Sequence, residues 1–151
     1  TLFNESDLTT LLTNAEHRTR AVTELAALVE AAGADGVNID FEGGGAGSKA
    51  GLVSFTEEMQ AAVDEVFLAT PAVDWEGAYD YDALAAASDG LFIMAYDYHW
   101  SGGNPGPIAP LTGGGPWSSY AMDWTLNDYR TWGTPDDKII MGFCIFFKCW
   151  Y

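Results

Sequence analysis

The sequence predicts an α/β protein with a parallel sheet, and more specifically a fragment of a (β/α)8 TIM barrel. Helical and strand patterns alternate four times along the 151 residues without a hairpin signal, as in successive βαβ units. Polar residues also gather where the predicted strands end, the edge at which barrel enzymes keep their active sites. Four units are about half of a barrel that typically takes ~250 residues. A small doubly wound sheet is the competing arrangement, which composition does not exclude.

The first predicted unit is a helix over 18–32 followed by a strand over 36–41. Asn14 is a candidate N-cap of the helix, and Gly33 is its stop signal. Apolar residues recur at helical spacing on one face, namely Val22, Leu25, Leu28 and Val29.

The strand of this unit alternates strictly between apolar and polar residues. Its apolar members are Val37, Ile39 and Phe41. Asn38, Asp40 and Glu42 occupy the alternate positions, and alternate residues of a strand share a face. If the apolar side packs against helices, the three polar side chains line the interior of the barrel near its open end.

The pattern then recurs three times. The expected elements are a helix over 50–63, a strand over 66–72, a short helix over 79–88, a strand over 91–98, a helix over 119–132 and a last strand over 138–147. The apolar face of the helix over 50–63 consists of Leu52, Phe55, Met59 and Val63. Glycine-rich loops cover 43–48 and 101–116.

The chain is strongly acidic, with 22 acidic against 6 basic residues and a formal net charge of −16. Such a chain repels nucleic acid and anionic membranes, and suits a neutral or cationic ligand such as an uncharged or partly deacetylated sugar polymer. The alternative is that acidity serves solubility alone. No apolar run reaches the ~18 residues that a membrane span needs. Cys144 and Cys149 form neither a CxxC pair nor a cluster with histidine, so a disulfide and two free thiols both remain open.

Asp40 and Glu42 form the candidate catalytic pair. Close carboxyl groups in a region of low dielectric constant raise each other's pKa, which suits a site that needs a protonated carboxyl near neutral pH. An isolated DxE more often lies on the solvent face of an edge strand, but the preceding DG and the following glycine loop favour a site here. A metal-binding α/β protein is a further alternative. With no second carboxylate cluster to supply ligands, we expect no metal and no cofactor.

Three ordered motifs resemble those of glycoside hydrolase family 18, which includes chitinases, endo-β-N-acetylglucosaminidases and bacterial spore-wall hydrolases. DGVNIDFE (35–42) is similar to the family's DGxDxDxE signature, and MAYDY (94–98) to its Met-x-Tyr-Asp motif. DDKIIMGFCIFF (136–147) resembles its strand with a Pro-aromatic-Tyr-Gly turn. The resemblance covers nearly all of 1–151, as a partial catalytic domain with strands four to seven of the eight-stranded barrel.

The resemblance implies a role for each matching residue. Glu42 is the acid that protonates the glycosidic oxygen and later the base for water. Asp40 orients the substrate's N-acetyl group, whose oxygen attacks the anomeric carbon, so this class departs from the two-carboxylate rule. Tyr96 hydrogen-bonds the acetamido oxygen, and Met94 and Asp97 shape the floor of the pocket. The structural alternatives are core packing for Met94 and a turn cap for Asp97.

Aromatic residues of the predicted top loops are further candidates for sugar binding. Trp75 and Trp100 are the first choices for stacking on sugar faces, with Trp117 as a third, although each can equally serve as a hydrophobic anchor. His99 is expected at the rim.

The chain departs from the family pattern at two places. Asn38 replaces the middle Asp of the signature, so it can hydrogen-bond Asp40 but cannot share a proton with it. Cys144 and the residues after it replace the Pro-aromatic-Tyr-Gly turn, as in a frameshifted or truncated gene product. With strands one to three and eight missing, we expect the isolated chain to be inactive and marginally stable, an expectation that a cooperative melt above ~50 °C contradicts.

The sequence thus predicts a retaining glycosidase that cleaves β-1,4-linked N-acetylglucosamine polymers by substrate-assisted catalysis. The alternative is a non-catalytic, chitin-binding member of the same fold. The expected setting is secreted or wall-associated, with a monomeric full-length protein. Chitin, peptidoglycan and N-glycans all present an N-acetyl group at the cleaved sugar, so these substrates are not distinguished.

Overall fold

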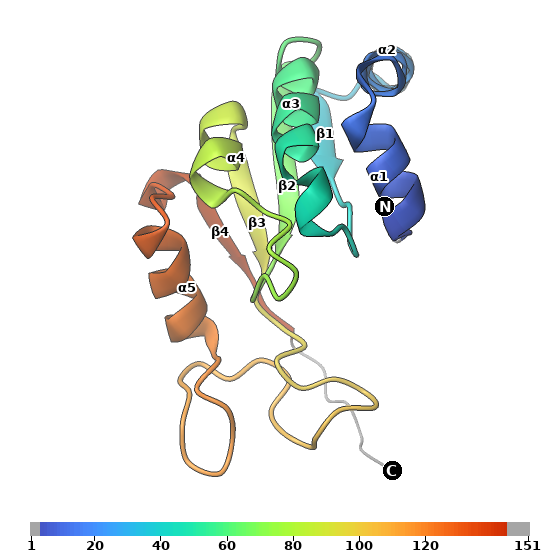
Figure 1. Ribbon diagram of the computed structural model, residues 1–151. Helices are drawn as coiled ribbons and strands as arrows, with labels where there is room; N and C mark the ends of the chain where they lie inside the picture. Colours follow the sequence, from blue (N-terminus) through green and yellow to red (C-terminus); the bar gives the residue numbers. More distant parts are fainter. Residues whose placement is uncertain (1–3, 145–151) are drawn as a thin grey trace.

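A four-stranded parallel sheet organises residues 4–144, the part of the chain that the computed structural model describes (Figure 1). Its strands are β1 (Gly36–Ile39), β2 (Glu65–Pro71), β3 (Gly90–Met94) and β4 (Ile139–Gly142). Each strand pairs in parallel with the next one along the chain, in the order β1-β2-β3-β4. A doubly wound sheet reverses direction at a switch point, whereas this order never reverses. The arrangement is that of consecutive barrel units, as predicted.

Helices connect the strands and pack against one face of the sheet (Figure 1). They are α1 (Glu5–Thr13), α2 (Ala15–Ala32), α3 (Lys49–Gln60), α4 (Tyr81–Ala87) and α5 (Met122–Thr131), with two short 3-10 turns at Ala46–Ser48 and Asp136–Lys138. Leu52, Phe55 and Met59 of α3 are buried as predicted, and Val63 packs beyond the end of this helix.

The N-terminal helix α1 was not predicted. Leu8 and Leu12 are four residues apart and both are buried, so a short apolar stripe was present in a segment whose composition is otherwise polar. The side chain of Asn4 caps α1 by accepting from the backbone N–H of Asp7. Asn14 caps α2, as expected from the sequence. Leu28 of α2 is exposed, so its predicted place on the buried face is wrong.

The two faces of the sheet differ in polarity. Ile39, Leu68 and Leu91 stand in register across β1, β2 and β3, and all three are buried against the helices. Residues at the alternate positions of each strand face away from the helices, and Asn38 and Phe92 line a hollow on that side. The predicted alternation of the first strand is confirmed, because Val37 and Phe41 join the helix-facing core while Asn38 and Asp40 do not.

The strands end earlier than predicted. Ala95 still donates its backbone N–H to the carbonyl oxygen of Gly142 in β4, but the N–H groups of Ala95 and Tyr96 also bond to carbonyl groups two residues back. This bend ends the strand before residue 98, where its end was expected. β1 stops at Ile39 and β4 at Gly142. The rest of the predicted last strand, residues 145–147, and Cys149 lie outside the described residues. Within those, Cys144 is a free thiol.

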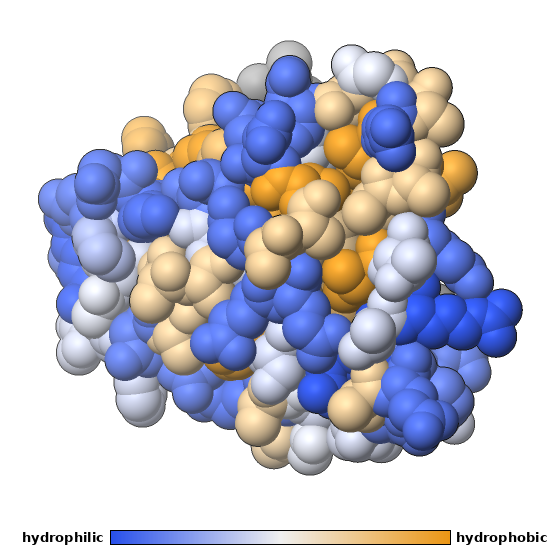
Figure 2. All heavy atoms as spheres, turned by 90° about the horizontal axis from the view of Figure 1, so that it is seen from above, coloured by the Kyte–Doolittle hydropathy of each residue, from blue (hydrophilic) through white to orange (hydrophobic). Residues whose placement is uncertain are grey.

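The face at which the strands begin is mostly hydrophilic, with hydrophobic patches near its centre (Figure 2). The predicted catalytic residues follow the carboxyl ends of strands, so they lie at the opposite end of the molecule. No helix within residues 4–144 combines the length and hydrophobicity needed to cross a bilayer.

Candidate active site

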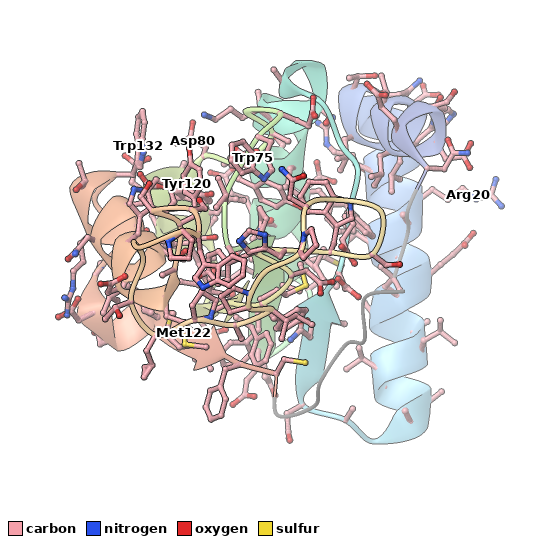
Figure 3. All side chains as sticks on the ribbon, turned by 90° about the horizontal axis from the view of Figure 1, so that it is seen from below. Arg20, Trp75, Asp80, Tyr120, Met122 and Trp132 are labelled. Atoms are coloured by element: carbon pink, nitrogen blue, oxygen red, sulfur yellow. The ribbon has the colours of Figure 1, made fainter. Side chains whose placement is uncertain are left out.

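A cavity of about 430 Å³ lies at the carboxyl ends of the strands, the end seen in Figure 3. Six residues singled out from the sequence line it: Glu42, Trp75, Met94, Tyr96, Asp97 and Trp100. They come from the segments that follow β1, β2 and β3. The parallel order of the strands therefore brings together side chains that are widely separated along the chain.

A second hollow, of about 330 Å³, adjoins the first on the face of the sheet opposite the helices. Asn38 and Asp40 line it, and Met94 and Tyr96 line both hollows. Glu42 lines the first hollow and Asp40 the second, and Tyr96 lies where the two hollows meet. Asp40 and Glu42 are therefore on the same side of the sheet. The two hollows together contain the predicted catalytic residues and, of the three candidate tryptophans, Trp75 and Trp100 but not Trp117.

The electrostatic surroundings keep Glu42 protonated to higher pH than an ordinary glutamate. Burial raises the pKa of Glu42, and the negative charges of Asp40 and Asp97 raise it further. The pKa of the Tyr96 phenol is also raised, first by burial and then by the charge of Glu42. No lysine or arginine appears among the described residues that line the two hollows. This site can hold a proton and offer it to a neutral ligand.

Asp97 occupies a backbone conformation that non-glycine residues seldom adopt, with φ at 55°. Aspartate tolerates this region better than most residues because its short side chain can bond to nearby backbone groups. Residues in such conformations cluster at functional sites, where the surrounding structure holds them in place. Asp97 lies three residues after the end of β3 and lines the cavity, so its conformation sets the path of the chain past the site.

Tyr79 holds the segment between the two candidate catalytic residues. Its hydroxyl donates to the backbone carbonyl oxygen of Phe41 over 2.6 Å. Burial raises the pKa of this phenol, so the group stays protonated and acts as a donor. The position of Tyr79 is itself fixed, because the carboxylate of Asp74 accepts from the backbone N–H groups of Ala78 and Tyr79 over 3.0 and 2.9 Å.

Sequence reasoning missed Tyr79, Tyr98 and Tyr120. Tyr98 lines the cavity, and its hydroxyl lies 2.7 Å from that of Thr125. Tyr120 also lines the cavity and packs edge-on against Trp75, with ring centroids 4.8 Å apart. The spacing Tyr96-x-Tyr98 was an available signal. The sequence placed Tyr79 and Tyr120 at the starts of predicted helices, over 79–88 and 119–132, whereas α4 begins at Tyr81 and α5 at Met122, so both tyrosines lie in loops.

Two further residues of the top loops lie outside the cavity lining. His99 faces Trp117 edge-on with ring centroids 6.1 Å apart, and His99 Nδ1 lies 3.1 Å from the carbonyl oxygen of Asn104. Neither residue is among those that line the two hollows. In residues 4–144, no group of three or more His, Cys, Asp or Glu side chains is arranged to hold a metal ion.

Comparison with known proteins agrees with this geometry. Residues 3–151 match the sequence model of the glycosyl hydrolases family 18. The chain is 36% identical over 111 residues to YdhD of Bacillus subtilis, a protein named as a sporulation-specific glycosylase, and the match covers 68% of this chain and 26% of that protein. Mouse chitotriosidase-1 is 28% identical over 163 residues, with 93% and 35% covered.

Solved structures give the same result. The crystal structure of YdhD superposes with a TM-score of 0.81 at 30% identity, over 95% of this chain and 48% of that one. The C-terminal domain of a Desulfitobacterium hafniense protein named as a chitinase superposes with a TM-score of 0.77 at 33% identity, over 90% and 42%. The chain thus spans about half, or less, of the length of the proteins that it matches.

Proposed function

The chain belongs to the glycosyl hydrolases family 18, and on that premise we propose that it supplies the catalytic acid of a retaining glycosidase acting on β-1,4-linked N-acetylglucosamine polymers. One observation carries the proposal. Glu42 lies at the mouth of a cavity with a raised pKa, beside Asp40 and Tyr96 on the same side of the sheet. A carboxyl group that stays protonated is what a general acid requires.

In the first step, Glu42 donates its proton to the glycosidic oxygen as the bond to the anomeric carbon breaks. The acetamido oxygen of the substrate attacks that carbon from the other face, so the nucleophile belongs to the substrate and an oxazolinium intermediate forms. Glu42, now a carboxylate, then accepts a proton from the water that opens the ring. The two inversions give net retention of configuration.

Asp40 and Tyr96 serve the acetamido group. The carboxylate of Asp40 orients the N–H and stabilises the positive charge of the oxazolinium ring. The Tyr96 hydroxyl, whose raised pKa keeps it protonated, donates to the acetamido oxygen. Asn38 lines the same hollow as Asp40, which supports a role for its amide in orienting that carboxylate.

Aromatic side chains around the cavity bind the sugar rings. Trp75 and Trp100 are exposed and line the cavity, which suits stacking on the apolar faces of pyranose rings. The names of mouse chitotriosidase-1 and of the Desulfitobacterium protein support a chitin-like substrate. A polymeric substrate of this kind suits a secreted or wall-associated enzyme.

The decisive experiment compares Glu42→Gln with the unsubstituted protein on a chromogenic diacetylchitobioside. The assay uses a chimera in which residues 4–144 replace the matching strands of YdhD, because we expect this chain alone to be inactive. We expect the turnover number to fall by about 10²–10⁴ in the variant. Glu30→Gln, an exposed change on α2, is the matched control and leaves turnover unchanged. Equal turnover for Glu42→Gln and the unsubstituted protein would remove Glu42 from the mechanism.

The alternative is a non-catalytic carbohydrate-binding protein with the same fold. It predicts that chitooligosaccharides bind to the chimera without turnover, whichever residue occupies position 42. Glu42 occupies the position of the acid in the family signature, which favours the catalytic proposal.

A further inference from the structure

An aromatic and acidic groove lies beside the catalytic cavity, between the loop that follows β2 and helix α5. Its volume is about 580 Å³. Val73, Trp75 and Tyr120 line both this groove and the catalytic cavity, so the two adjoin. We refer to the part that extends from Trp75 to Trp132 as the side groove.

The side groove exposes flat aromatic surfaces. The residues Trp75 and Trp132 are exposed to 66% and 62%. Tyr120 lies between two indoles, edge-on to Trp75 at 4.8 Å and to Trp124 at 4.6 Å between ring centroids. Trp75, Tyr120 and Trp132 lie on one side of the molecule, far from the exposed Arg20 (Figure 3). Exposed indoles that gather in one hollow mark a ligand-binding surface more often than scattered ones do.

The same groove is strongly negative. Asp74, Asp80, Asp82 and Asp128 line it, and Lys49 is the single basic residue in the lining that the described chain provides. Asp74 already accepts hydrogen bonds from two backbone N–H groups, so its role is to stabilise the loop. Asp80 lies between Trp132 and Trp75 in Figure 3 and is half-buried. A hydrogen bond with Asp82 raises the pKa of Asp80 and lowers that of Asp82, so the exposed Asp82 carries the negative charge of this pair.

The indole faces and the carboxylates together indicate which kind of ligand fits the side groove. Indole faces attract the apolar faces of sugar rings and also cations, which interact with the ring quadrupole. Carboxylates attract cations and leave a neutral acetamido group without a charged partner. A protonated amino group on a pyranose ring satisfies both surfaces, whereas an N-acetylated sugar satisfies the aromatic surface alone.

We propose that the side groove binds glucosamine units, with free ammonium groups, of the same aminosugar chain whose N-acetylated unit occupies the catalytic cavity. The proposal rests on the proposed function for the identity of the chain. It deepens that function by assigning a partly deacetylated polymer as the preferred ligand. Trp75 and Tyr120 line both sites, so one chain that passes over these two side chains contacts both.

The test measures binding of glucosamine hexamer and of N-acetylglucosamine hexamer by titration calorimetry, with Glu42→Gln present throughout so that no hydrolysis occurs. We expect the Kd of the glucosamine hexamer to rise at least about fivefold in Trp132→Ala, and similarly in the double variant Asp80→Asn, Asp82→Asn. Trp132→Phe, which keeps an aromatic face, retains most of the affinity. Trp117→Ala, which removes an exposed indole outside both linings, is the matched control and leaves the Kd unchanged.

The proposal that the side groove binds glucosamine is refuted if Trp132→Ala and the double Asp variant bind the glucosamine hexamer with the Kd of the parent protein, while circular dichroism shows that both variants are folded. It is also refuted if N-acetylglucosamine hexamer loses affinity equally in the Asp variant, because charge then plays no part. Higher salt weakens only the charge-dependent binding. Failure of the catalytic proposal has a different signature, namely equal turnover with and without Glu42, and leaves these binding results standing.

Discussion

The Tyr79 hydroxyl donates to the Phe41 carbonyl oxygen over 2.6 Å, and thereby holds the backbone between Asp40 and Glu42. The two residues are 38 positions apart in sequence, so the bond fastens the loop after β2 to the end of β1. This hydrogen bond affects the site in two ways. The bond satisfies a backbone carbonyl just past the end of the strand, and it restricts the rotation that sets the direction of the Glu42 side chain.

We expect Tyr79→Phe to reduce kcat about tenfold with little change in KM, because a misdirected acid loses transition-state contacts while sugar binding persists. The lost hydrogen bond costs about 1 kcal/mol of stability. Steady-state kinetics on the chimera and chemical denaturation check the two effects separately. Tyr129→Phe, which loses a comparable bond to the Pro71 carbonyl oxygen at 2.7 Å, is the control for stability loss alone. Equal changes in kcat for both variants would reduce Tyr79 to a purely structural residue.

Asp40→Asn should lower the pKa of Glu42. Of the two neighbouring negative charges that raise this pKa, that of Asp40 has the larger effect. Asp97→Asn should lower the same pKa by less. NMR titration of the Glu42 carboxyl carbon in the unliganded chain measures both directly and does not depend on activity. In the active chimera, the alkaline limb of the pH–rate profile moves to lower pH with Asp97→Asn. A larger effect from Asp97 than from Asp40 contradicts the ordering.

Glu42→Gln is expected to stabilise the fold at neutral pH. The folded-state pKa of Glu42 lies above its unfolded value, so the favourable contribution of its bound proton is present at low pH and is lost as pH rises through the folded pKa. At pH values above the unfolded pKa, folding must therefore either bury the carboxylate charge or take up a proton, and glutamine removes that cost. Thermal melts should show a higher Tm for Glu42→Gln at pH 7, and no difference near pH ~3, where glutamate is protonated in both states. Glu30→Gln shows no such pH dependence.

Much of the candidate site was predictable because strand alternation and chain order fix it. Once the run from Val37 to Phe41 is assigned as a strand, Asp40 must lie opposite the core, as it does in the structure. This consequence follows from local backbone geometry. The family resemblance implied the places of Met94 and Tyr96, and both line the same hollow as Asp40.

The features that sequence reasoning missed depend on loops and short segments. Tyr79 reaches Phe41 from a loop, and Tyr120 reaches Trp75 from another, through contacts that no periodic pattern encodes. Helix α1 was missed because its apolar stripe is only Leu8, Leu11 and Leu12 within a polar segment. The end of β3 at Met94 depends on a bend whose hydrogen bonds belong to the backbone, so side-chain patterns carried no sign of it.

The chain alone should unfold below ~50 °C. Within residues 4–144, β1 and β4 are each paired on one side, and the sheet face opposite the helices leaves Asn38 and Phe92 lining an open hollow. Unpaired strand edges and an uncovered face lower stability and favour association. Circular dichroism melts at two protein concentrations check this, with size-exclusion chromatography to detect association. A concentration-independent, cooperative melt above ~50 °C for a monomer contradicts the prediction.

The order β1-β2-β3-β4 also bears on how such a protein can evolve. Because each strand pairs only with its neighbours along the chain, a duplicated or recombined βα unit can join either edge without rethreading the units already present. Gene fusion or duplication can therefore lengthen the sheet one unit at a time. Asp40 and Glu42 follow β1 whereas Tyr96 follows β3, so these residues are inherited together only when three consecutive units are kept intact.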